Sequence, residues 1–172
     1  LDDFSRVGEY YMLAVEPAKQ GYNASYIYCD EETMYIARDQ MKLLEGRLPQ
    51  KEDEVAVSRY FLSNYGADAG IGEKVMLNSE SFHGEYTVTG ILEGYKEKEV
   101  NGSSILLSKE ALKGWSGYDP ADYRAYVHFK NEQQMDETEL TARSREIAKE
   151  YQLEMPIMNL SYMKFYKQPV NV

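Results

Sequence analysis

The sequence has little of what reactive or membrane-spanning proteins need. Among its 172 residues there is one cysteine, Cys29, which excludes an internal disulfide and any metal site made only of cysteines. There are two histidines, and no stretch approaches the roughly 18 consecutive apolar residues that a membrane-spanning helix requires. We therefore expect that the chain as given does not cross a bilayer.

Basic residues are also scarce. Lys and Arg number 19 against 29 Asp and Glu, which gives a formal net charge of -10 at pH 7. Nucleic-acid-binding proteins place Lys and Arg against the phosphate backbone, so this composition argues against a nucleic-acid partner. An anionic membrane surface would also repel most of this chain.

The chain begins at Leu1, and no charged segment followed by an apolar one comes after it. We therefore expect a piece of a longer protein whose targeting or anchoring segment lies outside it. A single cysteine is compatible with the cytosol and with many bacterial exteriors, so the redox compartment stays open.

Motifs for catalysis or metal binding are missing as well. His83 and His128 do not form an HExxH pattern, so a zinc site would need carboxylates from distant parts of the chain. No serine stands in a Gly-x-Ser-x-Gly elbow, and Cys29 is more typical of a small buried hydrophobic residue than of a nucleophile. The acids are numerous enough to form close pairs by chance, and a glycosidase pair requires a separation that sequence does not give. We expect no catalytic residue, no metal and no cofactor.

The segment from Gly70 to Lys74, GIGEK, superficially resembles a phosphate-binding loop. It lacks the Gly-x4-Gly-Lys-Ser/Thr spacing of that loop and the third glycine of the dinucleotide fingerprint. We predict a tight turn that leads into a strand at Lys74.

The sequence does contain the material for a folded domain. Hydrophobic residues make up 43% of it, and 172 residues can bury a sizeable core. Sixteen tyrosines stand against five phenylalanines and one tryptophan. Strand propensity and packing explain this bias most simply, while the tyrosine-rich faces are also the candidate contact surface.

Strands predominate in the pattern of apolar residues and turn signals. Alternating or short apolar runs predict strands over residues 9–15, 24–28, 34–37, 54–57, 74–77, 85–92, 103–107 and 124–129. Residues 40–44 are predicted as one helical turn. This order does not alternate regularly as a doubly wound sheet would, so the predicted fold class is α+β.

Three helices are predicted from their capping residues. Ser58 is expected to begin a helix through Tyr65 that Gly66 closes, and Ser108 a short helix that ends at Gly114. The longest helix is predicted over residues 137–151, where Asp136 and Glu139 form a capping box. An extended final segment is predicted around Pro156.

The stretch from Glu45 to Ser58, EGRLPQKEDEVAVS, combines a Gly-Arg-x-Pro turn, an acidic loop and a short Glu-Val strand. It is followed by YGADAGIGEKVML, with a glycine-rich turn, and by EYTVTGIL in a predicted hairpin. This order resembles the extracytoplasmic, MacB periplasmic core-like domain of MacB/FtsX-type ABC transporter permeases. The residues singled out as its structural motif are Gly46, Arg47, Pro49, Glu54, Ser58, Gly66, Gly72 and Gly90.

Each motif residue has a structural reason to be present. Glycine permits the turn and proline fixes it. Arg47 can pair with an acid or with backbone carbonyls. None of them needs to contact a ligand.

The resemblance implies a division of the chain into two parts. Residues 1–45 with 118–172 would form a porter-like part with a mixed sheet and the long C-terminal helix. Residues 46–117 would form an inserted β-rich, Sabre-like lobe. In the family, the domain is inserted between the first two of four transmembrane helices, so both ends of the chain are expected side by side at the membrane.

The resemblance also implies a function without catalysis. The domain would lie on the extracytoplasmic face of the bacterial cell membrane and couple ATP-driven movement of the membrane helices to events outside. The implied partners are the transmembrane helices of the same permease, a separate cytoplasmic ATPase subunit and a second permease copy. A peptide, a lipoprotein, an antibiotic or a hydrolase would be the cargo or external partner.

Two other hypotheses are compatible with the residues. One is a free-standing secreted or lipid-anchored module whose acidic, tyrosine-studded surface binds a cationic peptide or a glycan. The other is a hydrolase that uses scattered carboxylates. Apolar spans on both sides of this chain in the full gene would favour the permease, and a single amino-terminal signal would favour the module.

Overall fold

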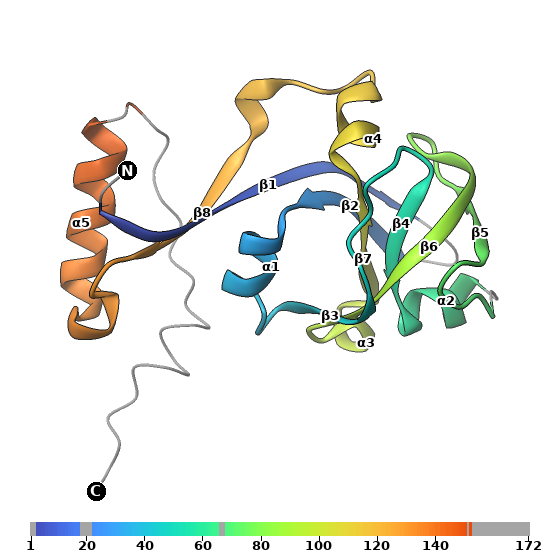
Figure 1. Ribbon diagram of the computed structural model, residues 1–172, viewed down its shortest axis with the longest axis horizontal. Coiled ribbons are helices and arrows are strands. Elements are labelled where there is room, and N and C mark those ends of the chain that lie inside the picture. The colour runs from blue at the N-terminus through green and yellow to red at the C-terminus, as the bar shows by residue number, and fades with distance from the viewer. Residues whose placement is uncertain (1–2, 18–21, 66–67, 151, 153–172) are drawn as a thin grey trace, which may run out of the picture. The chain divides into compact units, whose positions relative to one another are not determined.

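The computed structural model describes residues 3–17, 22–65, 68–150 and 152. They form an α+β fold in which strands predominate, as predicted (Figure 1). The strands are β1 (Phe4–Pro17), β2 (Asn23–Cys29), β3 (Met41–Gly46), β4 (Glu54–Ser58), β5 (Lys74–Asn78), β6 (His83–Gly94), β7 (Gly102–Leu107) and β8 (Arg124–Phe129). The helices are α1 (Glu31–Ile36), α2 (Arg59–Tyr65), α3 (Glu97–Val100), α4 (Lys109–Gly114) and α5 (Glu137–Glu150), with the short 3-10 turns η1 (Pro120–Asp122) and η2 (Glu132–Gln134).

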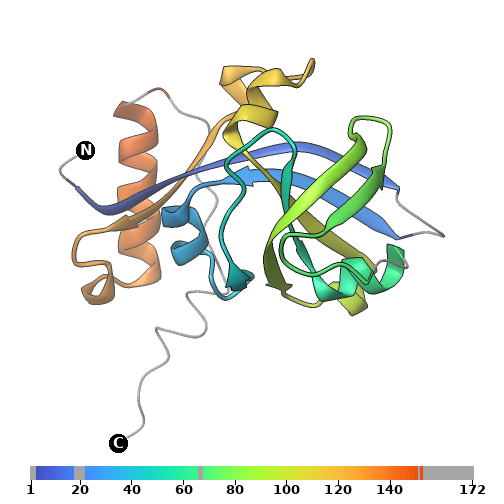
Figure 2. The same ribbon diagram turned by 45° about the vertical axis from the view of Figure 1, so that its right-hand side comes forward.

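The strands belong to one mixed sheet in the order β3-β6-β4-β7-β2-β1-β8, with β5 paired to β6 off this path. β4 runs parallel to β6, and β2 parallel to β7, while β1 with β2, β3 with β6, β4 with β7 and β5 with β6 are antiparallel. Figure 2 shows β1 and β2 running side by side over most of their length. The predicted mixed sheet with one long helix near the C-terminus is confirmed.

The long strand β6 organises one end of this sheet. Thr87 pairs with Lys74 of β5 and with Glu54 of β4, and Gly90 pairs with Gly46 of β3 and again with β4. β3 and β5 therefore lie along the same side of β6, one at each end, while β4 occupies the opposite side. Every residue of β4 is buried, which explains why EVAVS reads as an uninterrupted run rather than an alternation.

The sheet buries apolar side chains on both faces, because neighbouring residues of a strand point in opposite directions. On β2, Tyr26 and Tyr28 join the larger core cluster, whereas Ile27 and Cys29 join the smaller one. α2 and α4 contribute Phe61 and Leu112 to the larger cluster. α1 contributes Met34 to the smaller cluster, so helices cover both faces.

The predicted capping residues begin the helices as expected. Ser58 Oγ accepts a hydrogen bond from the Phe61 N–H at 3.0 Å, and Ser108 Oγ accepts one from the Ala111 N–H at 3.0 Å. At α5 the box is reciprocal, because Asp136 Oδ1 accepts from the Glu139 N–H at 2.8 Å and Glu139 Oε2 from the Asp136 N–H at 2.9 Å. Gly66, the predicted end of the second helix, and the segment around Pro156 lie outside the described residues, as do both chain ends.

Two predicted elements are wrong. Residues 34–37, predicted as a strand, belong largely to α1, which begins after Asp30 because its carboxylate accepts from the Thr33 N–H at 2.8 Å. Residues 40–44, predicted as a helical turn, enter β3 because they pair with the end of β6. The one-turn helix α3 was not predicted.

The chain divides into two compact units. One comprises residues 1–5 and 128–172, and the other comprises residues 6–127. These boundaries differ from the predicted division into residues 1–45 with 118–172 and residues 46–117. The predicted porter-like part and inserted lobe therefore stay a prediction.

Candidate functional site

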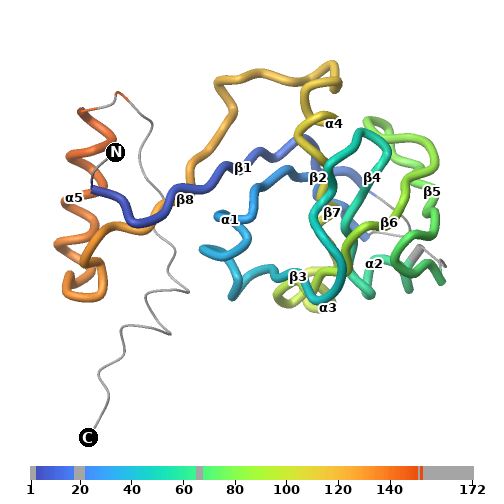
Figure 3. Tube along the Cα trace, in the orientation of Figure 1, coloured from blue at the N-terminus to red at the C-terminus, as the bar shows by residue number. Residues whose placement is uncertain are grey.

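The Gly-Arg-x-Pro motif forms a corner where β3 ends and the chain turns toward β4 (Figure 3). Gly46, the last residue of β3, has φ +78°, a conformation that favours glycine. A Cβ atom at this position would lie 2.2 Å from the Thr89 carbonyl oxygen, and the Arg47 N–H donates to the same oxygen at 2.9 Å. Both backbone conformation and close approach therefore require a glycine here.

Gly90 of β6 stands opposite Gly46 in the strand register. A Cβ atom at Gly90 would lie 2.6 Å from the Arg47 carbonyl oxygen and 3.0 Å from the Ala56 Cβ. The end of β3 thus lies directly against the β6 backbone, and a Cβ atom at either glycine would collide with a neighbouring backbone carbonyl.

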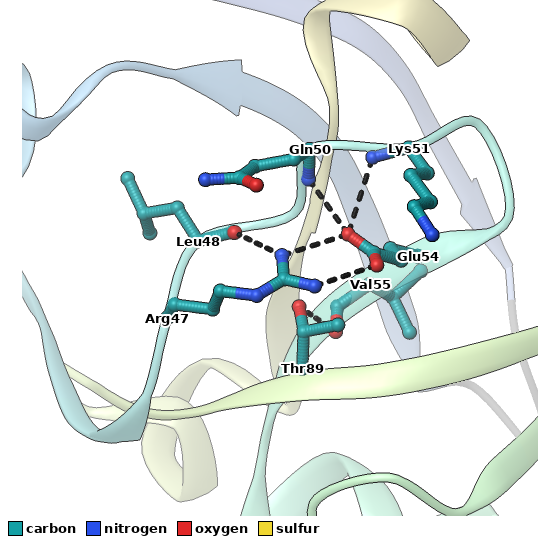
Figure 4. A network of polar contacts seen from close by, with 7 residues as sticks. All are labelled: Arg47, Leu48, Gln50, Lys51, Glu54, Val55 and Thr89. Atoms are coloured by element: carbon teal, nitrogen blue, oxygen red, sulfur yellow. Dashed lines mark hydrogen bonds and ion pairs between the residues drawn. The ribbon is translucent and has the colours of Figure 1, made fainter.

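Arg47 and Glu54 hold the two ends of the following loop together (Figure 4). Arg47 Nη1 donates to Glu54 Oε2 at 2.8 Å, and Nη2 donates to Oε1 at 2.6 Å, which makes the pair bidentate. Glu54 Oε2 also accepts from the backbone N–H groups of Gln50 at 2.9 Å and Lys51 at 3.1 Å. Arg47 Nη1 further donates to the Leu48 carbonyl at 3.1 Å. The loop from 47 to 54 is closed around one carboxylate.

The electrostatics follow from this geometry. Glu54 has only 7% of its side chain exposed, whereas Arg47 has 47% exposed. Hydrogen bonds from Arg47, followed by those from the Gln50 and Lys51 backbone, outweigh the desolvation and lower the pKa of Glu54 from 4.5 to about 2. The pKa of Arg47 is raised by its bonds to Glu54. A carboxylate that stays ionised and fully hydrogen-bonded is a poor proton acceptor or nucleophile, so this arrangement fixes a loop rather than performs chemistry.

The remaining motif residues support the same corner. Pro49 is buried within the loop, and Ser58 closes β4 and caps α2. Gly72 has φ +85°, and its N–H donates to the Val88 carbonyl of β6 at 2.8 Å, which forms the predicted tight turn before β5. Thr89, which sequence reasoning missed, donates from its buried hydroxyl to the Val55 carbonyl at 3.3 Å and joins β6 to β4.

A second carboxylate, that of Glu16, holds the tip of the β5–β6 hairpin by hydrogen bonds. Glu16, near the end of β1, accepts from the Glu80 N–H at 2.8 Å and from the Ser81 N–H at 3.0 Å. Ser79 closes the same tip, because its hydroxyl accepts from the Phe82 N–H at 2.9 Å. The hairpin tip is thereby attached to a strand more than 60 residues away in the sequence.

Packing accounts for much of the tyrosine content. The ring of Tyr123 lies 5.2 Å from that of Tyr11 and 6.2 Å from that of Tyr118, between centroids, and the Tyr11 hydroxyl accepts from the Asp119 N–H at 3.0 Å. These contacts attach the segment before β8 to the sheet. The fully or nearly buried tyrosines are Tyr11, Tyr22, Tyr26 and Tyr28. A role of tyrosine-rich faces as a contact surface stays a prediction.

The residues considered for chemistry lie apart from one another. His83 begins β6, while His128 lies in β8 with its Nδ1 3.5 Å from Glu132 Oε1. Cys29 is buried, and burial raises the pKa of its thiol to about 12. In the parts of the chain that the structure describes, no three His, Cys, Asp or Glu side chains are grouped so as to hold a metal ion. Over the same residues, no helix combines the length and apolar character of a membrane span.

Comparison with known proteins identifies the fold. No protein-family model and no curated protein sequence matches the chain. Among solved structures, the chain is similar to the extracellular domain of the noncanonic ABC-type transporter YknZ from Gram-positive bacteria, with a TM-score of 0.57 and 14% identity over 92% of this chain and 83% of that one. It is also similar to the periplasmic region of MacB from Actinobacillus actinomycetemcomitans, with a TM-score of 0.57 and 13% identity over 95% of this chain and 76% of that one. The chain therefore has the fold of these extracytoplasmic transporter domains, and the predicted resemblance is confirmed at the level of the fold.

Proposed function

We propose that this chain is the non-catalytic extracytoplasmic domain of an ABC transporter permease. The observation that carries the proposal is the likeness of fold to the YknZ extracellular domain and the MacB periplasmic region, which extends over nearly the whole chain. The transmembrane helices of the same permease and a separate cytoplasmic ATPase would be its partners. The domain would pass movement of the membrane helices to a substrate or partner protein outside.

The described geometry suits a mechanical role. The glycine contact between β3 and β6 and the closed loop around Glu54 leave little freedom at the corner. Packed sheets with satisfied polar groups move as rigid bodies rather than deform continuously. Movement would then be passed on by each compact unit as a whole, residues 1–5 with 128–172 and residues 6–127.

Distance measurement between spin labels tests this function. In the full-length permease, freed of other reactive cysteines and assembled with its ATPase in nanodiscs, Lys113→Cys and Lys149→Cys place labels on exposed positions of α4 and α5, one in each unit. We expect the distance distribution to change between the nucleotide-free state and the ATP-bound state. Cys29 will stay unlabelled because it is buried.

A matched label pair within one unit provides the control. Lys98→Cys with Lys113→Cys joins α3 and α4 of the same unit, so its distances should stay constant in both nucleotide states. Unchanged distances for both pairs in a complex that hydrolyses ATP would contradict the coupling function. A full-length gene without flanking membrane spans would contradict the permease assignment itself.

The net charge of -10 favours one alternative, a free-standing module that binds a cationic peptide or a glycan. Such a module would be encoded with a single amino-terminal signal or lipid-anchor sequence. Binding of a lysine-rich peptide to the purified chain, lost on raising the salt concentration, would support it.

A further inference from the structure

β5 is an edge strand whose outer side has no partner strand among the described residues. Among the described residues it pairs only with β6, and in Figure 1 it lies on the outer side of that strand. The Val88 N–H donates to the Glu73 carbonyl at 2.8 Å, so residues 73, 75 and 77 direct their backbone groups toward β6. By alternation, Lys74, Met76 and Asn78 direct their N–H and C=O groups outward.

Of the features that usually prevent strand addition, this edge has two, its short length of five residues and Lys74. Natural edge strands are protected by short length, bulges, proline or charged side chains, especially Lys. β3, on the same side of β6, has a register shift between Leu43 and Glu45, whereas β5 pairs with β6 without a shift and contains no proline. Its one charge, Lys74, is neutralised by Glu85 with Nζ 3.0 Å from Oε2.

The sequence of β5 is complementary to itself when two copies run antiparallel. With Met76 on the two-fold axis, Met76 faces Met76 of the second copy, and Lys74 faces Asn78. On the other face of the sheet, the buried Val75 stands opposite Leu77. No like charges are opposed in this register, although the whole chain carries ten excess negative charges.

We infer that the outer edge of β5 is a self-association surface at which a second copy of this chain adds its own β5 antiparallel across a two-fold axis. The outward groups of Lys74, Met76 and Asn78 would form about six backbone hydrogen bonds with the second copy. The excess negative charge of the chain opposes close approach of two copies in general, whereas at this edge the charge of Lys74 is offset by Glu85.

The contact is small, so the association is weak in dilute solution. A five-residue strand pair buries well under the roughly 1,200 Å² of a stable interface. Two chains confined side by side would reach effective concentrations in the millimolar range, at which a weak contact is occupied. The inference does not depend on the proposed permease function, because the 172-residue chain can be tested alone.

Cysteine cross-linking of the purified chain tests the inference. Met76→Cys places two thiols across the axis, where Cα atoms of a hydrogen-bonded pair lie about 5.5 Å apart, within disulfide range. Leu44→Cys is the matched control, because Leu44 is 47% exposed on β3 and Met76 is 45% exposed on β5. Under mild oxidation at high protein concentration, we expect the Met76→Cys dimer to form roughly tenfold faster or more, since a pre-formed pair raises the effective thiol concentration. Equal rates for the two variants would overturn the inference.

A proline variant provides an independent test. Met76→Pro removes only an outward N–H, so it should keep the β5–β6 hairpin and prevent strand addition, while Met76→Ala leaves the backbone unchanged. In sedimentation velocity over a concentration series, we expect self-association of the natural chain and of Met76→Ala, and loss of it in Met76→Pro with an unchanged melting temperature. A chain that stays monomeric at millimolar concentration, or a Met76→Pro variant that still associates, would contradict the proposed surface.

Discussion

At the scale of single residues, the corner between β3 and β4 depends on one carboxylate. Glu54 is buried, and its two oxygens satisfy the Arg47 guanidinium and two backbone N–H groups of the loop. Removing the charge leaves those donors without an ionised acceptor, and a buried donor that loses its partner is costly.

Glu54→Gln should therefore destabilise the chain by about 2–3 kcal/mol at neutral pH. Because the folded pKa of Glu54 lies below the unfolded value, its contribution is complete above pH 4.5 and is lost as the pH falls toward about 2. The difference in unfolding free energy between the natural chain and Glu54→Gln should thus shrink below pH 4.5, as measured by urea unfolding over a pH series.

The exposed pair of Lys42 and Glu93 offers the matched control. Both side chains are more than half exposed, so Glu93→Gln should cost less than about 1 kcal/mol. A Glu54→Gln variant that behaves like Glu93→Gln would show that the closed loop does not contribute to stability.

The cost of replacing the glycine at the corner has two parts, backbone strain and steric contact, and two substitutions can separate them. Gly46 and Gly72 have similar positive φ, but a Cβ would meet the Thr89 carbonyl at Gly46 and nothing within 4 Å at Gly72. Gly72→Ala should cost about 1–2 kcal/mol from backbone strain alone. Gly46→Ala should cost clearly more, since the β6 backbone must move, and thermal unfolding of the two variants measures the difference. Equal losses would show that the close approach at Gly46 is relieved without cost.

Only part of this corner could be predicted from the sequence. The turn, the glycine and an acidic partner for Arg47 follow from local residue types. Gly90 was singled out with the motif, but its position opposite Gly46 and the role of Thr89 could not be recognised, because both residues lie more than 40 positions after Gly46 and approach the corner only through the β3–β6 pairing.

At the scale of elements, capping residues and alternation predicted most helices and strands. The predicted strand at residues 34–37 failed because a short apolar run suits a strand or a helix equally, and Asp30 decided for a helix. The helical turn predicted at residues 40–44 was wrong because these residues pair with β6, which lies far along the chain. Strand order and the parallel pairs β2–β7 and β4–β6 depend on such long-range contacts, which no local pattern contains.

The capping box of α5 provides a test at this scale. Asp136→Ala should destabilise the unit of residues 1–5 and 128–172 by about 1 kcal/mol, because the Glu139 N–H loses its acceptor. Glu137→Ala is the matched control, since it removes an acid from the same first turn but is not a partner in the box. Hydrogen exchange of α5 amides should accelerate more in Asp136→Ala. Equal acceleration would mean that charge near the helix start, and not the cap, stabilises α5.

At the scale of the whole molecule, a coupling domain should leave nucleotide chemistry to its partner. The turn at Gly70–Lys74 uses its own N–H groups, since Gly72 donates to Val88, Glu73 to Gly70, and Gly70 to the Glu73 side chain. Lys74 is engaged with Glu85. Three of the backbone donors in this turn are thus bonded within the fold and are not available to a phosphate.

The purified chain should therefore neither bind nor hydrolyse ATP. Titration calorimetry with ATP and magnesium should give no heat above dilution, and a coupled assay should give no turnover. Turnover by pure protein that disappears on replacement of a single acid would contradict the proposed coupling function.

The hydrogen bonds between Glu16 and the tip of the β5–β6 hairpin determine which positions can vary among related sequences. Glu16 is bound through the main-chain N–H groups of positions 80 and 81, which any residue except proline supplies, and through the side chains of Ser79 and Ser81. Substitution can therefore accumulate at position 80, while positions 79 and 81 favour a hydroxyl side chain and position 16 favours an acid. Among close homologues, a conserved glutamate or aspartate at position 16 should occur together with hydroxyl residues at positions 79 and 81 and a variable residue at position 80. A lineage that loses the acid should also show a shortened or rebuilt tip.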